Sequence, residues 1–174
     1  MVRVALLALC AFVALETVAA RAAAVAPPRP TFRPGAGWIV RMPTRSEQPD
    51  RFDSMTIAVT GGDAAVLRPF APFLGFRRLR PRGIIIWTTT IGAVATSPFV
   101  PFPRASWPLR LSDFRLDRGW EGQPAPNIQQ RVRAVSVRGW NVEVRVYFAT
   151  QRPDRKLLDA AQAELDRLVP PQPR

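Results

Sequence analysis

Apolar and polar residues alternate with a period of two in several segments, which is the pattern of β-strands that bury one face. The clearest case is the pair of segments 130–137 and 140–148, which Arg138 and Gly139 separate. In the second segment every second residue is Trp, Val or Phe, and the two residues between the segments can form a short turn. The pattern predicts a β-hairpin.

The register of this hairpin raises a problem of charge. A two-residue turn would place Arg133 opposite Val144 on the face that the valines bury. Because burying an unpaired charge is costly, we expect one extra residue to shift the pairing, as a β-bulge at Ala134 or Val135. The bulge would turn Arg131 and Arg133 toward solvent.

Other segments complete a sheet and a helix. Residues 84–91 are almost all β-branched or aromatic, which suits a central strand. Residues 38–42 and 52–60 are expected to form strands before it, and residues 109–116 a short strand after it. Over residues 154–168, apolar side chains recur at spacings of three and four, the pattern of a helix with one buried stripe. The expected fold class is therefore α+β: a largely antiparallel sheet of about five strands with a C-terminal helix packed on one face.

The N-terminal residues have the features of an export signal. Arg3 precedes an apolar run at 4–15, which is shorter than the roughly 20 residues that cross a bilayer. Cleavage is expected after Ala24, with Ala20 and Ala22 as alternatives. The other interpretation is an uncleaved segment that anchors the protein in the membrane.

The 174 residues fit one domain of ordinary size. The organisation expected is a signal peptide at 1–24, a Pro-rich linker at 25–35, a single α+β domain at 36–169 and a disordered tail at 170–174. The only cysteine, Cys10, would leave with the signal, so we expect no disulfide.

The formal charge of +12 indicates which partners are possible. It falls to +11 after cleavage because Arg3 and Arg21 leave with Glu16. In an exported protein this charge favours anionic lipid and acidic cell-wall polymer over nucleic acid. A GC-rich coding sequence, which favours arginine codons, is the alternative explanation of the same composition.

Missing residue types exclude several chemistries. The chain has no histidine, which removes Ser-His-Asp and Cys-His nucleophiles and ordinary zinc sites. Motifs for nucleotide phosphates and calcium are also absent. We therefore assign no catalytic residue, no metal site and no cofactor.

Arginines are the candidate anion-binding residues, because a guanidinium can bind phosphate or carboxylate through two hydrogen bonds. Some follow Phe76 in a basic run and others lie in the hairpin; a run of this kind is also typical of a solvated loop. The candidates are Arg77, Arg78, Arg80, Arg82, Arg131, Arg133 and Arg145.

A proline-rich loop at 99–107 carries three candidate partner-binding aromatics, Phe99, Phe102 and Trp107. Exposed together, they would form an apolar surface for a partner such as another envelope protein. The alternative is that they fold back into the core.

Three carboxylates, Asp113, Asp117 and Glu121, lie close together in sequence. A glycosidase-like pair needs two carboxylates facing one cleft, and a spacing of four aligns Asp113 with Asp117 only on a helix. Gly119 and the surrounding pattern do not support a helix. A solvated acidic patch beside the neighbouring arginines is the competing interpretation.

The strand and helix at the end of the chain, residues 142–168, resemble the ending of small secreted proteins of high-GC actinobacteria, whose function is uncharacterised. The resemblance extends to residues 37–40 and 81–85. It concerns packing and implies no active residue. A likeness to PsbP-type and Mog1-type α+β domains is architectural and implies a fold alone.

The function expected is that of an exported, non-catalytic domain, associated with the envelope or extracellular, with an arginine-rich surface for anionic lipid or wall polymer. One alternative is a protein-interaction module that uses loop 99–107. Another is a carboxylate-based, carbohydrate-active hydrolase. The sequence predicts no oligomeric state.

Overall fold

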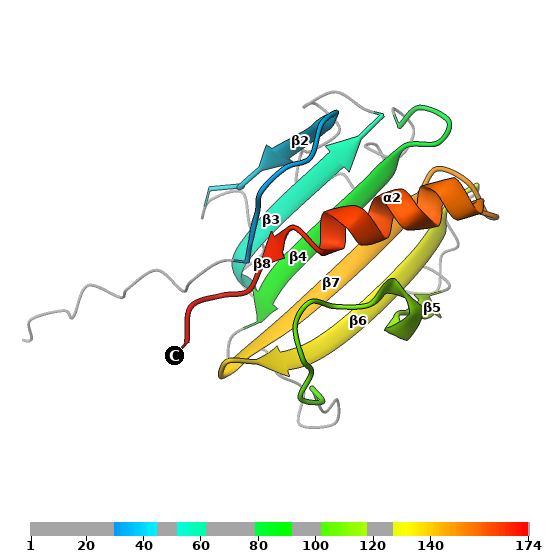
Figure 1. Cartoon of the computed structure of the whole chain (residues 1–174). Helices are drawn as coiled ribbons and strands as arrows, with labels where there is room; N and C mark the ends of the chain where they lie inside the picture. Colours follow the sequence, from blue (N-terminus) through cyan, green and yellow to red (C-terminus); the bar gives the residue numbers. More distant parts are fainter. Residues whose placement is uncertain (1–29, 45–51, 62–78, 92–101, 118–126, 174) are drawn as a thin grey trace, which may run out of the picture.

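One antiparallel sheet forms the body of the protein (Figure 1). A computed structural model describes residues 30–44, 52–61, 79–91, 102–117 and 127–173. Within these ranges the sheet has six strands in the order β2-β3-β4-β7-β6-β5. Their bounds are Trp38–Arg41 (β2), Phe52–Thr60 (β3), Ile84–Ile91 (β4), Arg115–Asp117 (β5), Gln129–Val137 (β6) and Trp140–Phe148 (β7).

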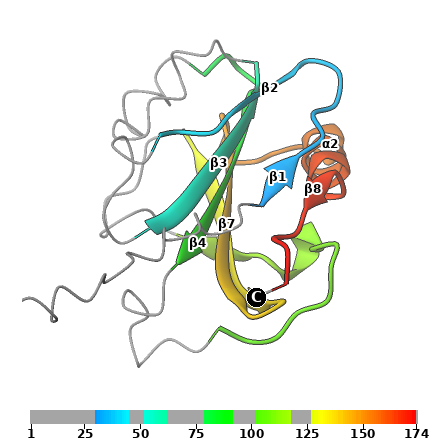
Figure 2. The same ribbon diagram turned by 90° about the vertical axis from the view of Figure 1, so that its left-hand side faces the viewer.

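A helix and a second, smaller sheet lie on one face of the large sheet. The helix α2 spans Arg155–Leu165. The strands β1 (Thr31–Phe32) and β8 (Leu168–Val169) pair antiparallel with each other. Figure 2 shows α2, β1 and β8 on the same side of the sheet. This arrangement places a strand inside the segment 25–35 that the sequence assigns to a linker.

The α+β class and the mainly antiparallel sheet are confirmed, but the described sheet has six strands instead of about five. The expected strand at 109–116 is replaced by a short 3₁₀ helix, η3 (Leu111–Asp113), and β5 begins only at Arg115. The central position of β4, between β3 and β7, is as expected from its β-branched sequence.

Both faces of the central strands are buried. On the face that carries α2, sheet residues such as Ile86 and Val144 form one apolar cluster with Leu157, Ala161 and Leu165 of the helix. On the opposite face a second cluster contains residues such as Met55, Trp87 and Tyr147. We refer to these two faces below as the helix face and the far face.

The predicted hairpin is present, but the predicted β-bulge is wrong. Pairing between β6 and β7 runs without interruption and places Arg133 opposite Val144. The two-residue turn is made by Arg138 and Gly139, which both have positive φ, as a type I′ turn requires. No bulge is needed because the long Arg133 side chain extends beyond the valines, and its Nη1 donates to the carbonyl of Asp113 at 3.1 Å.

The helix is shorter than its apolar pattern predicts. Asp154 is the N-cap residue, and its carboxylate accepts a hydrogen bond from the backbone N–H of Leu157 at 2.9 Å. The helix ends at Leu165, and Leu168 instead belongs to β8. In the expected tail, the carbonyl of Gln172 accepts a hydrogen bond from Trp140 Nε1 at 2.9 Å. No helix in the described ranges has the length and apolar composition to span a membrane.

Candidate anion-binding site

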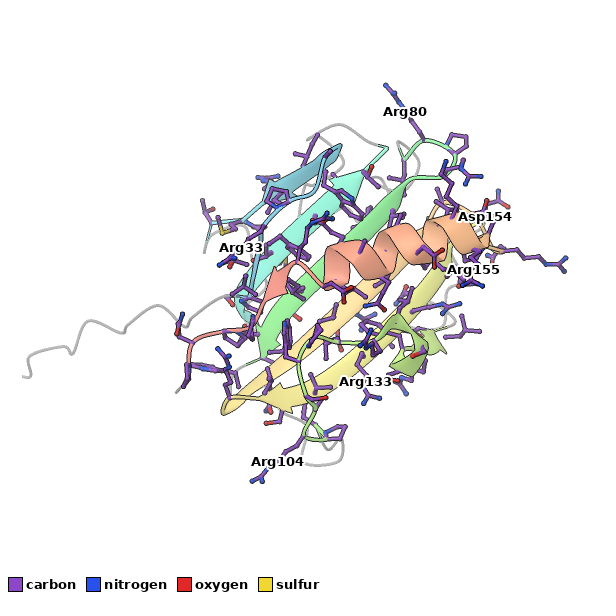
Figure 3. All side chains as sticks on the ribbon, viewed as in Figure 1. Arg33, Arg80, Arg104, Arg133, Asp154 and Arg155 are labelled. Carbon is purple, nitrogen blue, oxygen red and sulfur yellow. The ribbon has the colours of Figure 1, made fainter. Side chains whose placement is uncertain are left out.

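The candidate arginines before β4 lie near the N-terminal end of α2. Arg82 forms an ion pair with Asp154 at 2.8 Å. Arg80 is exposed and extends away from the protein (Figure 3). Arg77 and Arg78 lie outside the described residues. Asp154 has a pKa below its ordinary value, because Leu157 N–H and then Arg82 stabilise the charged carboxylate.

Arg145 lies on the far face and is neutralised by carboxylates. Its Nε is 2.6 Å from Glu143 Oε1, and its Nη1 is 3.3 Å from Asp117 Oδ2. Burial lowers the pKa of Arg145, but the hydrogen bond to Glu143 and the charges of Glu143, Tyr147 and Asp117 together outweigh that effect, and the pKa is raised overall. With its charge balanced in this way, Arg145 is a structural ion-pair residue more than an anion receptor.

Arg131 and Arg133 pair with Val146 and Val144 and therefore lie on the helix face, whereas Arg145 lies on the far face. Arg131 Nε donates to Gln129 Oε1 at 2.9 Å. Arg133 lies beneath η3 and beside a pocket at the edge of the sheet. The described arginines of the predicted set are therefore divided between two faces and the α2 end, and the fold does not bring them together on one surface.

The pocket at the edge of β6 has a volume of about 410 Å³. Three elements build it: the segment 104–110, the 3₁₀ helix η3 and strand β6. The residues that line it are Arg104, Ala105, Ser106, Trp107, Pro108, Leu109, Arg110, Asp113 and Arg133. Apart from Trp107 and Leu109, these side chains are charged, polar or small.

Backbone pairing fixes the walls of this pocket. Ser136 of β6 donates its N–H to the carbonyl of Pro103 at 2.9 Å and accepts from Ala105 N–H at 3.3 Å. Beyond them, Trp107 Nε1 donates to the carbonyl of Leu168 at 2.8 Å. The segment thus continues the edge of the sheet and is held at both β6 and β8.

Three guanidinium groups and one carboxylate line the pocket, which leaves an excess of positive charge. Arg104 and Arg110 are exposed and form no ion pair with any described residue. Figure 3 shows Arg104 extending from the rim into solvent. Arg133 Nε is buried and has no hydrogen-bond partner in the described structure. An unsatisfied buried donor of this kind costs about 1–3 kcal/mol.

The aromatic residues of loop 99–107 do not form one exposed surface in the part that is described. Trp107 packs against the helix-face cluster and lines the pocket. Phe102 is half-buried, and Phe99 lies outside the described residues. Trp107 therefore belongs with the arginine pocket.

The carboxylates that the sequence places together point in different directions. Asp113 lines the pocket on the helix face, whereas Asp117 accepts hydrogen bonds from Gln130 and Arg145 on the far face. Glu121 lies outside the described residues. In the ranges that the structure covers, no group of three or more His, Cys, Asp or Glu side chains could hold a metal ion.

Sequence reasoning missed Arg104 and Arg110 as candidates. Arg104 belongs to the proline-rich loop 99–107, whereas Arg110 belongs to the expected strand 109–116. The sequence pattern therefore gives no reason to group them. Only the pairing of the 103–105 segment with β6 brings them toward Arg133. That contact joins residues about thirty positions apart, and no local pattern reports it.

The fold and the site together define the class of protein as an α+β domain with an arginine-lined pocket at the edge of its sheet. Searches against protein-family models, curated proteins and solved structures find no match to this chain.

Proposed function

We propose that this protein is an exported, non-catalytic domain that associates with the cell envelope by binding anionic lipid or acidic wall polymer. The signal-like pattern of residues 1–24 supports export. The high net charge, nearly all of it arginine, supports an acidic partner. On this proposal the mature chain begins near Val25.

The observation that carries the proposal is a surplus of exposed guanidinium groups. Among the described side chains, five carboxylates already pair with arginine: Asp117, Glu143, Asp154, Asp159 and Glu164. Exposed arginines with no ion pair in the same part of the chain are Arg33, Arg80, Arg104, Arg110, Arg115, Arg138 and Arg152. Their charge is available to an external anion.

These arginines are spread around the protein instead of covering one flat face. Arg33, Arg80 and Arg104 lie at different sides of the sheet (Figure 3). Such a distribution suits a flexible polyanion, which can follow separated charges, whereas a membrane surface contacts only the arginines on one side. Near an anionic membrane each basic residue contributes about 1 kcal/mol, so a few arginines in contact are enough for measurable association.

The test of this proposal is co-sedimentation of the purified protein at low salt with three partners. These are vesicles containing phosphatidylglycerol, vesicles of phosphatidylcholine alone, and an isolated phosphodiester wall polymer. We expect binding to the anionic vesicles, the polymer or both, and little binding to the neutral vesicles. Equal binding to neutral vesicles, or no binding to either anion, would contradict the proposal.

Export is tested separately by fractionating cells that produce the full chain and determining the N-terminus of the product. We expect it outside the cytoplasm and shortened to begin near Val25, or intact and held in the membrane under the anchor alternative. Recovery of the intact chain dissolved in cytosol would overturn the assignment.

A further inference from the structure

We infer that the pocket at the edge of β6 binds a phosphate group carried on a polyol or sugar. This inference rests on the proposed function, because polyol phosphate is chemistry that anionic phospholipid headgroups and phosphodiester wall polymers share.

The size of the pocket fits one such group. Its volume of about 410 Å³ lies at the lower end of the range of small-molecule sites, roughly 300–1,000 Å³. A phosphate with a three-carbon or six-carbon polyol fits this space, whereas a whole lipid does not. The pocket is also open on one side, so a longer chain can continue into solvent.

The charge of the pocket matches a phosphate better than a single carboxylate. Arg104, Arg110 and Arg133 bring three positive charges, and Asp113 removes one. A phosphate monoester, as at the end of a polymer chain, carries about −1.5 to −2 near neutral pH and offers three strong acceptor oxygens. A phosphodiester within a chain carries one negative charge and offers two such oxygens. Those oxygens can accept from more than one guanidinium group at once.

Asp113 and Trp107 account for the polyol part of the ligand. A carboxylate accepts hydrogen bonds and donates none at neutral pH, so beside an anion site it suits a hydroxyl and disfavours bare phosphate. The nearby hydroxyl of Ser112, 3.4 Å from Asp113 Oδ1, illustrates that role. Trp107 lines the same pocket and supplies apolar ring surface for the C–H groups of a polyol.

The experiment is isothermal titration calorimetry of protein purified from cells that produce the full chain. The probes are glycerol phosphate, inorganic phosphate and glycerol. The test variant is the double substitution Arg104→Gln and Arg110→Gln, because both side chains are exposed and neither forms an ion pair with a described residue. The control is the double substitution Arg80→Gln and Arg152→Gln, which removes the same charge outside the pocket. Thermal unfolding verifies that each variant is folded.

We expect glycerol phosphate to bind saturably and more tightly than inorganic phosphate, and glycerol not to bind. The pocket variant should lose affinity by roughly tenfold or more, as expected when charge-assisted hydrogen bonds are removed, while the control stays within about twofold. The substitution Asp113→Asn should reduce the preference for glycerol phosphate over inorganic phosphate. Absence of saturable binding, or equal losses in both double variants, would overturn the inference.

Calorimetry on the pocket and co-sedimentation with vesicles or polymer test the site and the proposed function separately. If the pocket variant keeps full binding to anionic vesicles and polymer, the site is wrong and envelope association stands. If glycerol phosphate binds in the pocket but neither vesicles nor polymer co-sediment, the site stands and the proposed function is wrong.

Discussion

At the scale of single residues, the most unusual group is the buried carboxylate of Glu164. It is fully buried on α2, and its Oε2 accepts from Gly35 N–H at 3.2 Å and from Arg167 at 3.3 Å. Its Oε1 has no hydrogen-bond partner in the described structure. The helical spacing from Leu157 and Ala161 brings position 164 beside the apolar stripe, but Gly35 lies 129 residues away. The sequence therefore could not predict what holds this carboxylate.

Glu164 should make stability fall as the pH rises. Burial raises its pKa, and the partners Gly35 and Arg167 offset only part of that effect. Between the ordinary value of 4.5 and the higher pKa of the folded state, the folded protein binds more protons than the unfolded chain. The free energy of unfolding therefore decreases through this window as pH rises, relative to the variant Glu164→Gln, which cannot titrate there.

Urea unfolding of both proteins from about pH 4 to pH 7 measures this difference. The stability of the wild type minus that of Glu164→Gln should decrease with rising pH. Arg167→Gln removes the positive partner, so the pKa of Glu164 rises further and the total decrease should be larger. A difference that grows with pH would mean that the native site favours the charged carboxylate.

At the scale of elements, alternation of side chains predicts β6 and β7 well, because strand period and turn residues are local. The register was wrong for a physical reason: the length of the Arg133 side chain lets its guanidinium reach Asp113 O. The prediction of a strand at 109–116 was also wrong, because contacts with neighbouring elements determine the conformation of a short segment at the sheet edge. Its η3 is held by Leu111 N–H donating to Gln162 Oε1 of α2 at 2.7 Å, a contact that no local pattern contains.

The hairpin turn should be sensitive to one glycine. Gly139 has φ of +83°, which a side chain disfavours. The substitution Gly139→Ala should therefore lower the free energy of unfolding by about 1 kcal/mol or more. Arg138→Asn is the matched control, because asparagine tolerates the φ of +52° at that position and should leave stability equal or higher. Urea unfolding of the two variants should place Gly139→Ala below Arg138→Asn; the reverse order would contradict the turn geometry.

The N-cap of α2 gives a second prediction at this scale. Asp154→Asn keeps an acceptor for Leu157 N–H but loses the ion pair with Arg82, whereas Asp154→Ala loses both. The melting temperature should therefore decrease in the order wild type, Asn variant, Ala variant. The pKa of Asp154 is lower in the folded protein than in the unfolded chain. Its carboxylate therefore contributes to the free energy of unfolding at pH values above the pKa of the unfolded chain, and this contribution disappears as the pH falls through the pKa of the folded protein. Equal melting temperatures of the two variants near pH 7 would argue against the cap.

At the scale of the whole molecule, composition predicts the net charge but not which arginines remain available. The fold neutralises Arg145 on the far face and Arg82 beside α2. It also brings Arg104 and Arg110 to the pocket of Arg133. Ion pairs and the pairing of segment 103–105 with β6 both join residues that are far apart in the sequence. Clusters of arginine in the sequence therefore do not predict which arginines form the basic surface of the folded chain.

The salt dependence of binding to vesicles containing phosphatidylglycerol shows whether the exposed arginines and the pocket bind anions electrostatically. Wild type is compared with the pocket variant, Arg104→Gln with Arg110→Gln, and with the control variant of equal charge, Arg80→Gln with Arg152→Gln. Co-sedimentation of the wild type should fall steeply between about 50 and 300 mM salt. Both variants should be released at lower salt than the wild type, and the pocket variant at the lowest. Binding that does not change with salt concentration would contradict electrostatic association, and three identical release curves would contradict a role for the pocket.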